Sequence, residues 1–293
     1  MMSTHLSKVV NVASVPKRSP FRYPGGKTWL IPRIRQWLSN RPSSELIEPF
    51  AGGGIVSLTA VMENLVEQAT MVELDEDIAA VWQTILYGCA ESLAERIVSF
   101  PLSVENLREV LAKKPCTVEE RAFQTILKNR CFRGGILADG AGLIKNGENG
   151  KGINSRWYPD TLKKRILEIA KYSDRIMFIA GDGFQVMEAS AHRSDVAFFL
   201  DPPYTVAAKR LYRYPNVDHE RLFDICEMVK GDFLLTYDNA EQVRCLAMAR
   251  RFEMRTISMK NSHHAEQREL LVGRELSWIG SRAISASQFA LAI

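Results

Sequence analysis

Short apolar runs that end in turn residues and lead into helical patterns recur along this 293-residue chain. The first run, at residues 46–47, leads into E-P-F-A-G-G-G at 48–54, and apolar residues then repeat at helical spacing over 55–65. A strand over 70–74 and a helix from about 77 to 87 follow. Strands that alternate with helices predict an α/β fold, in which a mostly parallel sheet carries helices on both faces.

The alternation returns in the second half of the chain, after an interruption. The later segments are strands at 176–180, 196–200 and 233–237, and helices at about 161–172, 218–230 and 239–250. Before them, residues 91–128 are helical in pattern with breaks at Pro101 and Pro115, and residues 129–158 hold seven of the 18 glycines. We therefore expect residues 91–159 to be an inserted, mainly helical subdomain that ends in a flexible loop.

Positive charge is concentrated in one segment, which overlaps the second half of this insert and extends just beyond it. The chain carries a net charge of +4, but residues 121–165 alone contain ten Lys and Arg against three Asp and Glu, a local +7. Such a concentration is typical of a surface that contacts phosphates, although a solvated basic face is the alternative. The candidate contacts are Arg130, Arg133, Lys145, Lys151 and Arg156.

Other features of the sequence argue against several classes of protein. No apolar run approaches the roughly 18 residues of a membrane span. Residues 1–19 lack the apolar centre of a secretory signal, so we expect a flexible leader. The five cysteines are odd in number and form no C-x-x-C pair, which argues against disulfides or zinc and fits a reducing cytosol. His263 and His264 have no evident third ligand, so we expect no bound metal.

Two motifs at strand ends indicate a nucleoside-containing ligand. The glycines at 52–54 follow a strand and open a helix, so the backbone can approach a ligand and offer it free N–H groups; a tight turn is the alternative. Glu73 ends the next strand about 20 residues later, where an acid can accept both ribose hydroxyls. The acids at 75–77 are better explained as a helix start.

A third motif, D-P-P-Y at residues 201–204, directly follows an apolar strand. Two prolines in series fix φ twice and remove two donors, which leaves a stiff corner bearing a carboxylate, carbonyls and a ring. Asp201 and the carbonyl of Pro202 could each accept one hydrogen of a planar amine, while Tyr204 stacks on its ring. P-G-G-K at 24–27 and G-D-G-F at 181–184 are, taken alone, only turns.

In this order, the motifs resemble those of the Dam-like bacterial DNA adenine N6-methyltransferases. The resemblance covers about residues 20–90 and 120–275. It implies a Rossmann-like methyltransferase sheet, formed by residues 20–90 and 160–293, that binds S-adenosylmethionine (SAM) as cofactor and carries out catalysis. It also implies that residues 91–159 form the target-recognition subdomain.

The resemblance assigns roles to individual residues. The SAM-binding positions are Tyr23, Gly25, Gly26, Lys27, Glu48, Pro49, Phe50, Gly52, Gly53, Glu73, Asp182 and Phe184. The catalytic positions are Asp201, Pro202, Pro203 and Tyr204. DNA contacts are expected from the five basic residues above and from a stretch that looks like a β-hairpin loop, at Asn261, His263 and His264. The GATC-reading pattern of the family begins at 129–134 but is not continued at 135–138, so the resemblance predicts no target sequence.

The implied reaction is direct methyl transfer to adenine N6 in duplex DNA, after the base has left the helix. Alternatives are an RNA adenine methyltransferase, N4-cytosine transfer, which Asp201 in place of serine disfavours, and a non-catalytic SAM- or DNA-binding relative, which we would expect to lack Asp201 or Tyr204. We expect a cytoplasmic monomer or weak dimer of bacterial or phage origin. Any restriction nuclease that acts with it would be a separate protein.

Overall fold

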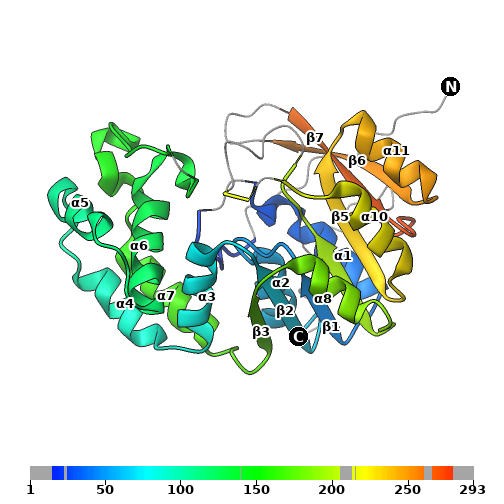
Figure 1. Cartoon of the computed structure of the whole chain (residues 1–293), viewed down its shortest axis with the longest axis horizontal. Coiled ribbons are helices and arrows are strands. Elements are labelled where there is room, and N and C mark those ends of the chain that lie inside the picture. Colours follow the sequence, from blue (N-terminus) through cyan, green and yellow to red (C-terminus); the bar gives the residue numbers. More distant parts are fainter. Residues whose placement is uncertain are drawn as a thin grey trace.

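One seven-stranded sheet forms the centre of the molecule in the computed structural model, which describes residues 15–22, 25–138, 140–204, 213–214, 216–260 and 266–279 (Figure 1). The strands are β1 (Glu45–Glu48), β2 (Gln68–Glu73), β3 (Ile176–Ala180), β4 (Val196–Leu200), β5 (Asp232–Asp238), β6 (Glu253–Lys260) and β7 (Glu266–Gly273). Their order is β3-β2-β1-β4-β5-β7-β6. The first five are parallel, whereas β7 runs antiparallel to β5 and β6. This is the Rossmann-like α/β sheet that the sequence predicts.

Helices cover both faces of the sheet. On one face lie α1 (Ile31–Asn40), α2 (Ile55–Met62) and α3 (Glu76–Leu86), and on the other α8 (Gly183–Ser190), α10 (His219–Met228) and α11 (Glu241–Ala249). Successive side chains of a strand point to opposite faces. In β4, Phe199 accordingly packs with the first set of helices, and Phe198 and Leu200 pack with the second. Among the described residues, no helix is long and apolar enough to cross a bilayer.

The insert is helical where the sequence predicts helices. These are α4 (Ala90–Ser99), α5 (Val104–Ala112) and α6 (Val118–Cys131), separated at Pro101 and Pro115. Ser103 and Thr117 precede α5 and α6, and each hydroxyl accepts a hydrogen bond from the backbone N–H three residues later. A proline after one helix and a capping side chain before the next therefore explain the boundaries.

The loop expected from residue 129 begins later, because α6 continues to Cys131 and buries Asn129 and Arg130. Beyond it the chain forms three short 3-10 turns, η2 (Arg133–Gly135), η3 (Glu148–Gly150) and η4 (Gly152–Arg156), and then α7 (Pro159–Ala170). We call α4 to α7 with these turns the helical body. It lies to one side of the sheet, with α3 between them (Figure 1).

The helical body is not a separate hydrophobic unit. α6 packs against α3, and α7 packs against α4. Leu93, Phe123 and Ile166 belong to the same apolar cluster as the side chains of α1 and α2. The apolar core therefore continues from the sheet into the helical body.

The N-terminal part of the described chain, residues 15–19 of the expected leader, is packed, and residues 1–14 lie outside the described residues. Val15 is 5% exposed within the apolar cluster. Arg18 pairs with Glu63 at 2.9 Å and so is held near the end of α2. A buried apolar side chain and an ion pair tie this stretch to the sheet domain.

The next residues are held by the helical body. Asn129 accepts a hydrogen bond from the N–H of Arg22 at 2.8 Å and donates one to its carbonyl at 2.9 Å. The guanidinium of Arg130 donates to the carbonyl of Pro20. Residues 15–22 therefore form a link between the sheet and the helical body, and Phe21 on this link is buried.

Candidate active site

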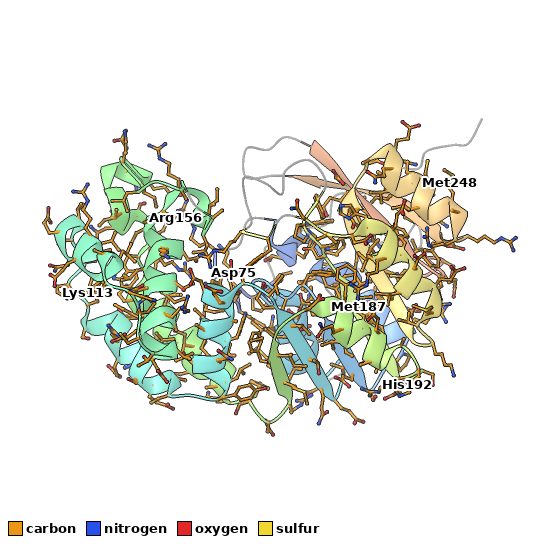
Figure 2. The ribbon with its side chains drawn as sticks, viewed as in Figure 1. Asp75, Lys113, Arg156, Met187, His192 and Met248 are labelled. Carbon is orange, nitrogen blue, oxygen red and sulfur yellow. The ribbon has the colours of Figure 1, made fainter. Side chains whose placement is uncertain are left out.

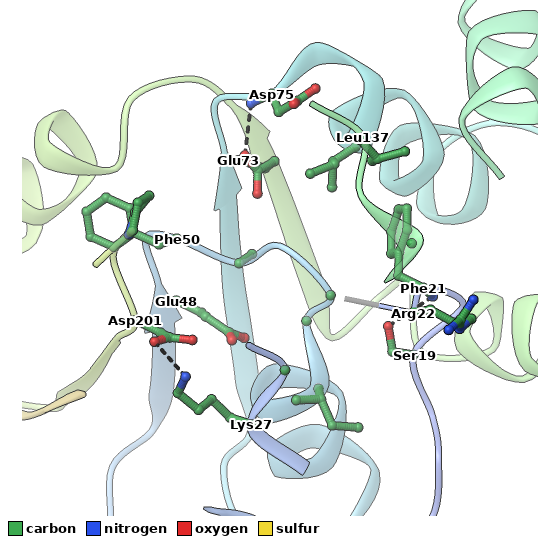
Figure 3. A pocket seen from close by; sticks show the side chains of 18 of the residues that line it. Ser19, Phe21, Arg22, Lys27, Glu48, Phe50, Glu73, Asp75, Leu137 and Asp201 are labelled. Atoms are coloured by element: carbon green, nitrogen blue, oxygen red, sulfur yellow. Dashed lines mark hydrogen bonds and ion pairs between the residues drawn. The ribbon is translucent and has the colours of Figure 1, made fainter. Parts of the chain in front are cut away.

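A cavity of about 500 Å³ lies at the carboxyl ends of β1, β2 and β4. The chain leaves β1 toward β2 on one side and β4 toward β5 on the other, so the strand order reverses here. Ligands of open α/β sheets bind at such a point. The sheet loops, the helical body and residues 15–22 all contribute walls, including Glu48, Phe50, Glu73, Asp201, Leu137 and Phe21 (Figure 3).

The glycine loop after β1 is held in place by hydrogen bonds and close packing. Glu48 is 3% exposed and accepts hydrogen bonds from the N–H of Ser57, at 3.0 Å, and from the Ser57 hydroxyl. Burial raises the pKa of Glu48 to about 8. Gly54 has a φ of 61°, and a Cβ there would lie 2.9 Å from the ring of Trp82. The indole N–H of Trp82 donates to the carbonyl of Gly52 at 2.9 Å, which fixes the loop.

Glu73 ends β2 and ties two loops together. Its Oε2 accepts from the N–H of Gly52 at 2.8 Å, and its Oε1 accepts from the N–H of Asp75 at 2.9 Å. Burial raises the pKa of Glu73 to about 7. Each oxygen has a further lone pair that can accept a hydroxyl from the cavity. Asp75 caps α3 by accepting from the N–H of Asp77, which confirms the helix-start interpretation.

The G-D-G-F stretch begins α8 and forms an aromatic wall of the cavity. Asp182 caps this helix by accepting from the N–H of Phe184 at 2.9 Å. Gly183 lies so close to Pro49 that a Cβ would be 2.3 Å from the Pro49 carbonyl oxygen. This approach brings Phe184 edge-on to Phe50, with ring centroids 5.9 Å apart and planes at 84°.

Asp201 follows β4, and its two carboxylate oxygens have different surroundings. Oδ1 accepts from the hydroxyl of Thr236 at 2.8 Å and lies 3.0 Å from Nζ of Lys27. Oδ2 has no hydrogen-bond partner among the residues that the structure describes. Figure 3 shows the Lys27 contact at one oxygen and the other turned toward the side of Glu48. Two donors therefore hold the carboxylate in place and leave Oδ2 for a ligand.

Lys27, which the resemblance assigns to SAM, contacts the D-P-P-Y corner in this structure. Its side chain is 3% exposed, and Nζ donates to the carbonyl of Gly25 at 2.9 Å. Besides Asp201, Nζ has Glu269 at 3.6 Å. The P-G-G-K and D-P-P-Y motifs thus meet through an ion pair at the cavity wall.

Tyr204 is not among the residues that line the cavity. Its hydroxyl donates to Oε2 of Glu269 at 3.0 Å, and its ring stacks on Tyr237 with centroids 5.8 Å apart. Burial raises the pKa of Tyr204 well above its usual range, so the hydroxyl remains a donor. This placement does not support the stacking role expected for Tyr204, because the side chain is engaged in interior contacts.

The basic residues predicted to contact DNA differ in their placement. Arg133, Lys145 and Lys151 are exposed on the helical body. Arg156 lines the cavity, pairs with Glu148 and lies on the helical body, across from Asp75 (Figure 2). Arg130 is 4% exposed, and burial lowers its pKa to about 9. Its burial and its bond to Pro20 argue against a phosphate contact by Arg130.

The remaining predicted residues are accounted for as follows. Gly26, Gly53 and Pro203 line the cavity, Pro202 is buried, and Gly25 and Gly52 act through the backbone bonds described above. Tyr23, Asn261, His263 and His264 lie outside the described residues. Within the described ranges, no three His, Cys, Asp or Glu side chains are grouped to hold a metal ion.

Sequence reasoning missed Thr236 and Glu269, both of which are buried beside Asp201 or its partners. Thr236 is a polar residue between apolar neighbours in β5, whereas Glu269 follows three other polar residues in β7. A buried polar side chain is normally hydrogen-bonded. The threonine within the predicted strand 233–237 therefore indicated that a polar partner lies beside this strand.

The reversal point of a Rossmann-like sheet, with an acid at the end of β2 and a glycine loop after β1, is typical of an enzyme that binds a nucleoside-containing cofactor. The sequence model of the family described as "D12 class N6 adenine-specific DNA methyltransferase" matches residues 23–258. The chain belongs to this family. SAM is its cofactor.

Solved structures with a similar fold are distant in sequence. An rRNA methyltransferase from Streptomyces viridochromogenes is 12% identical, with 86% of each chain covered and a TM-score of 0.37. A precorrin-6y C5,15-methyltransferase from Geobacter metallireducens is 7% identical, with 91% of this chain and 92% of that chain covered and a TM-score of 0.36. No curated protein matches the sequence.

The cavity residues fit SAM. The volume of the cavity lies in the range of small-molecule binding sites. Glu73 keeps lone pairs for ribose hydroxyls, and Phe50 and Phe184 offer apolar surface to a purine. Among the acidic side chains that line the cavity, those of Glu48, Glu73 and Asp201 lie at the strand ends and suit a ligand that carries a positive sulfur.

Proposed function

We propose that this chain transfers the methyl group of SAM to the N6 amine of adenine in duplex DNA. The supporting observation is the carboxylate of Asp201, which is fixed through Oδ1 and has Oδ2 available at the cavity. Family membership supports the same base and the same nucleic acid.

The target amine needs help because its lone pair is delocalised into the purine. Oδ2 of Asp201 would accept one N6 hydrogen and the carbonyl of Pro202 the other, which turns the lone pair out of the ring plane. When bound, SAM supplies a methyl group on a positively charged sulfur, an activated donor. Positioning is then the main task of the protein, and the proton released from N6 passes to Asp201 or to solvent.

We assign the cofactor as follows. Glu73 would accept the ribose hydroxyls, and Asp182, Phe184 and Phe50 would enclose the adenine ring. Glu48 and Pro49, with the glycines at 25–26 and 52–53, would border the methionine part, and Tyr23 remains a candidate for the same part. In this assignment Lys27 holds the carboxylate of Asp201 through their ion pair and does not bind SAM.

Duplex DNA would meet the helical body, which we assign as the target-recognition subdomain. Arg22, Arg133 and Arg156 line a hollow of about 270 Å³ beside the cavity. Burial and the neighbouring charge of Arg156 lower the pKa of Arg22, so a phosphate placed there would relieve repulsion between the guanidinium groups. Exposed Lys145 and Lys151 extend this basic surface. We propose that the protein acts in the cytosol, where such DNA lies. A cognate nuclease would be a separate protein.

The test is methyl transfer from radiolabelled SAM to duplex DNA and, in parallel, to ribosomal RNA, with the product nucleoside identified by mass spectrometry. We expect N6-methyladenine in DNA. Asp201→Asn should reduce the rate at least 100-fold, in line with loss of a positioned proton acceptor, and leave SAM binding within about threefold. Asp195→Asn is the matched control, because Asp195 precedes the same strand at its other end and pairs with Arg193. Methylation of RNA alone, or full activity of Asp201→Asn, would reject the proposal.

A further inference from the structure

Glu269 is a buried acid that the proposed reaction does not use. It lies on β7 opposite Asp238 of β5, at the end of the sheet where Asp201 is found. Its side chain is 8% exposed. Burying a carboxylate is unfavourable unless charged or hydrogen-bonding partners compensate.

Both contacts that Glu269 makes with described side chains lead to the D-P-P-Y corner. Oε2 accepts from the hydroxyl of Tyr204 at 3.0 Å and lies 3.6 Å from Nζ of Lys27. Nζ of Lys27 lies 3.0 Å from Oδ1 of Asp201 and 5.0 Å from the centre of the Tyr204 ring. Glu269 therefore holds the first and last side chains of the motif, one through a cation and one directly.

The position of Lys27 shows what a second acid changes. A buried ammonium with a single carboxylate partner forms a neutral pair, in which the carboxylate is a weaker acceptor for any further donor. With Glu269 on its other side, the ammonium is shared between two carboxylates and the group carries one net negative charge. Asp201 then keeps acceptor strength at Oδ2, the oxygen available to the ligand.

We propose that Glu269 is a positioning residue for methyl transfer, which acts by holding Lys27 and Tyr204 so that Asp201 presents Oδ2 to the target amine. This inference rests on the proposed function. Burial raises the pKa of Glu269 and the Lys27 charge opposes that rise, which agrees with the pairing.

The experiment compares Glu269→Gln with the wild type in single-turnover methylation of duplex DNA, together with the Kd values for SAM and DNA. Glutamine keeps the shape and can accept from Tyr204 but loses the charge that faces Lys27. We expect the single-turnover rate to fall at least tenfold, with both Kd values within threefold. Glu45→Gln is the matched control, since Glu45 also lies on a strand and pairs with Arg193 at the opposite end of the sheet; its rate should be unchanged.

A double-mutant cycle separates positioning from general stability. If Glu269 acts through Lys27, Glu269→Gln should slow a Lys27→Met enzyme by less than threefold, whereas a purely structural effect would persist in that background. Should Glu269→Gln fail to fold, Glu269→Asp keeps the charge and should retain more activity than Glu269→Ala. A wild-type rate in Glu269→Gln, or an undiminished effect in the Lys27→Met background, overturns the inference. If the wild type itself fails to methylate DNA, the proposed function is what fails.

Discussion

Replacing Gly183 by alanine tests whether the close contact between α8 and the loop after β1 shapes the cofactor cavity. The new Cβ would lie 2.3 Å from the Pro49 carbonyl oxygen and 2.8 Å from its Cβ. Ordinary van der Waals contact begins at 3.4 Å, about 1.1 Å more than the 2.3 Å to the carbonyl oxygen, so the helix and the loop must separate by about that amount. Overpacking of this kind costs roughly 1–3 kcal/mol of the free energy of unfolding.

The same movement should weaken SAM binding. Asp182 and Phe184 flank Gly183 at the start of α8 and would move with it, away from Phe50. We expect a rise in Kd of about tenfold, equivalent to about 1.4 kcal/mol. Chemical denaturation measures the free energy of unfolding, and isothermal titration calorimetry measures the Kd for SAM.

Gly181→Ala is the control, two residues away on the same turn. The nearest atom to a Cβ there is in the side chain of Ile179, at 3.9 Å, so the methyl group has room. Its free energy of unfolding should stay within about 0.5 kcal/mol of the wild type. If Gly183→Ala proves as stable and binds SAM as tightly as Gly181→Ala, the reasoning about this contact is refuted.

Two further predictions concern charge and the N-terminal link. Burial raises the pKa of Glu73 to about 7 and that of Glu48 to about 8, so both side chains gain negative charge as the pH rises from 6 to 9. The positive sulfur of bound SAM stabilises the charged forms and so lowers both pKa values. The Kd for SAM should therefore fall as the pH rises, by about tenfold for each group whose pKa is lowered by one pH unit. S-adenosylhomocysteine, which lacks the charge, should show a much smaller change in calorimetry, and equal slopes would contradict the prediction. Asn129→Ala removes three hydrogen bonds of a buried amide, two to Arg22 and one to Gly135, and should cost about 2–4 kcal/mol in denaturant unfolding. Asn154→Ala, at an exposed position, should cost almost nothing.

Much of the fold could be predicted from the sequence, because its signals are local. The strands at 176–180 and 196–200 coincide with the observed ones, since apolar runs between turn residues have few other interpretations. Pro101 and Pro115 act on the backbone around them, so the breaks between α4, α5 and α6 were also visible. The candidate cofactor positions could be read from motifs for the same reason.

The parts that were missed depend on contacts between distant segments. Nothing near Asn129 in the sequence shows that its amide will bind Arg22, 107 residues away. The pairing of Lys27 with Asp201 likewise depends on how the chain folds back, as does the interior position of Tyr204. Motif spacing indicates which residues share a site but not which of them touch.

The placement of β7 limits how this protein can be shortened. The match to the family ends at residue 258, whereas β7 spans Glu266–Gly273 and lies between β5 and β6. A fragment trimmed to the matched region would lack β7, so β5 would have an unpaired edge and β6 would have no neighbouring strand. Unpaired strand edges promote aggregation. Truncations for crystallisation or activity screening should therefore retain residues through at least 279.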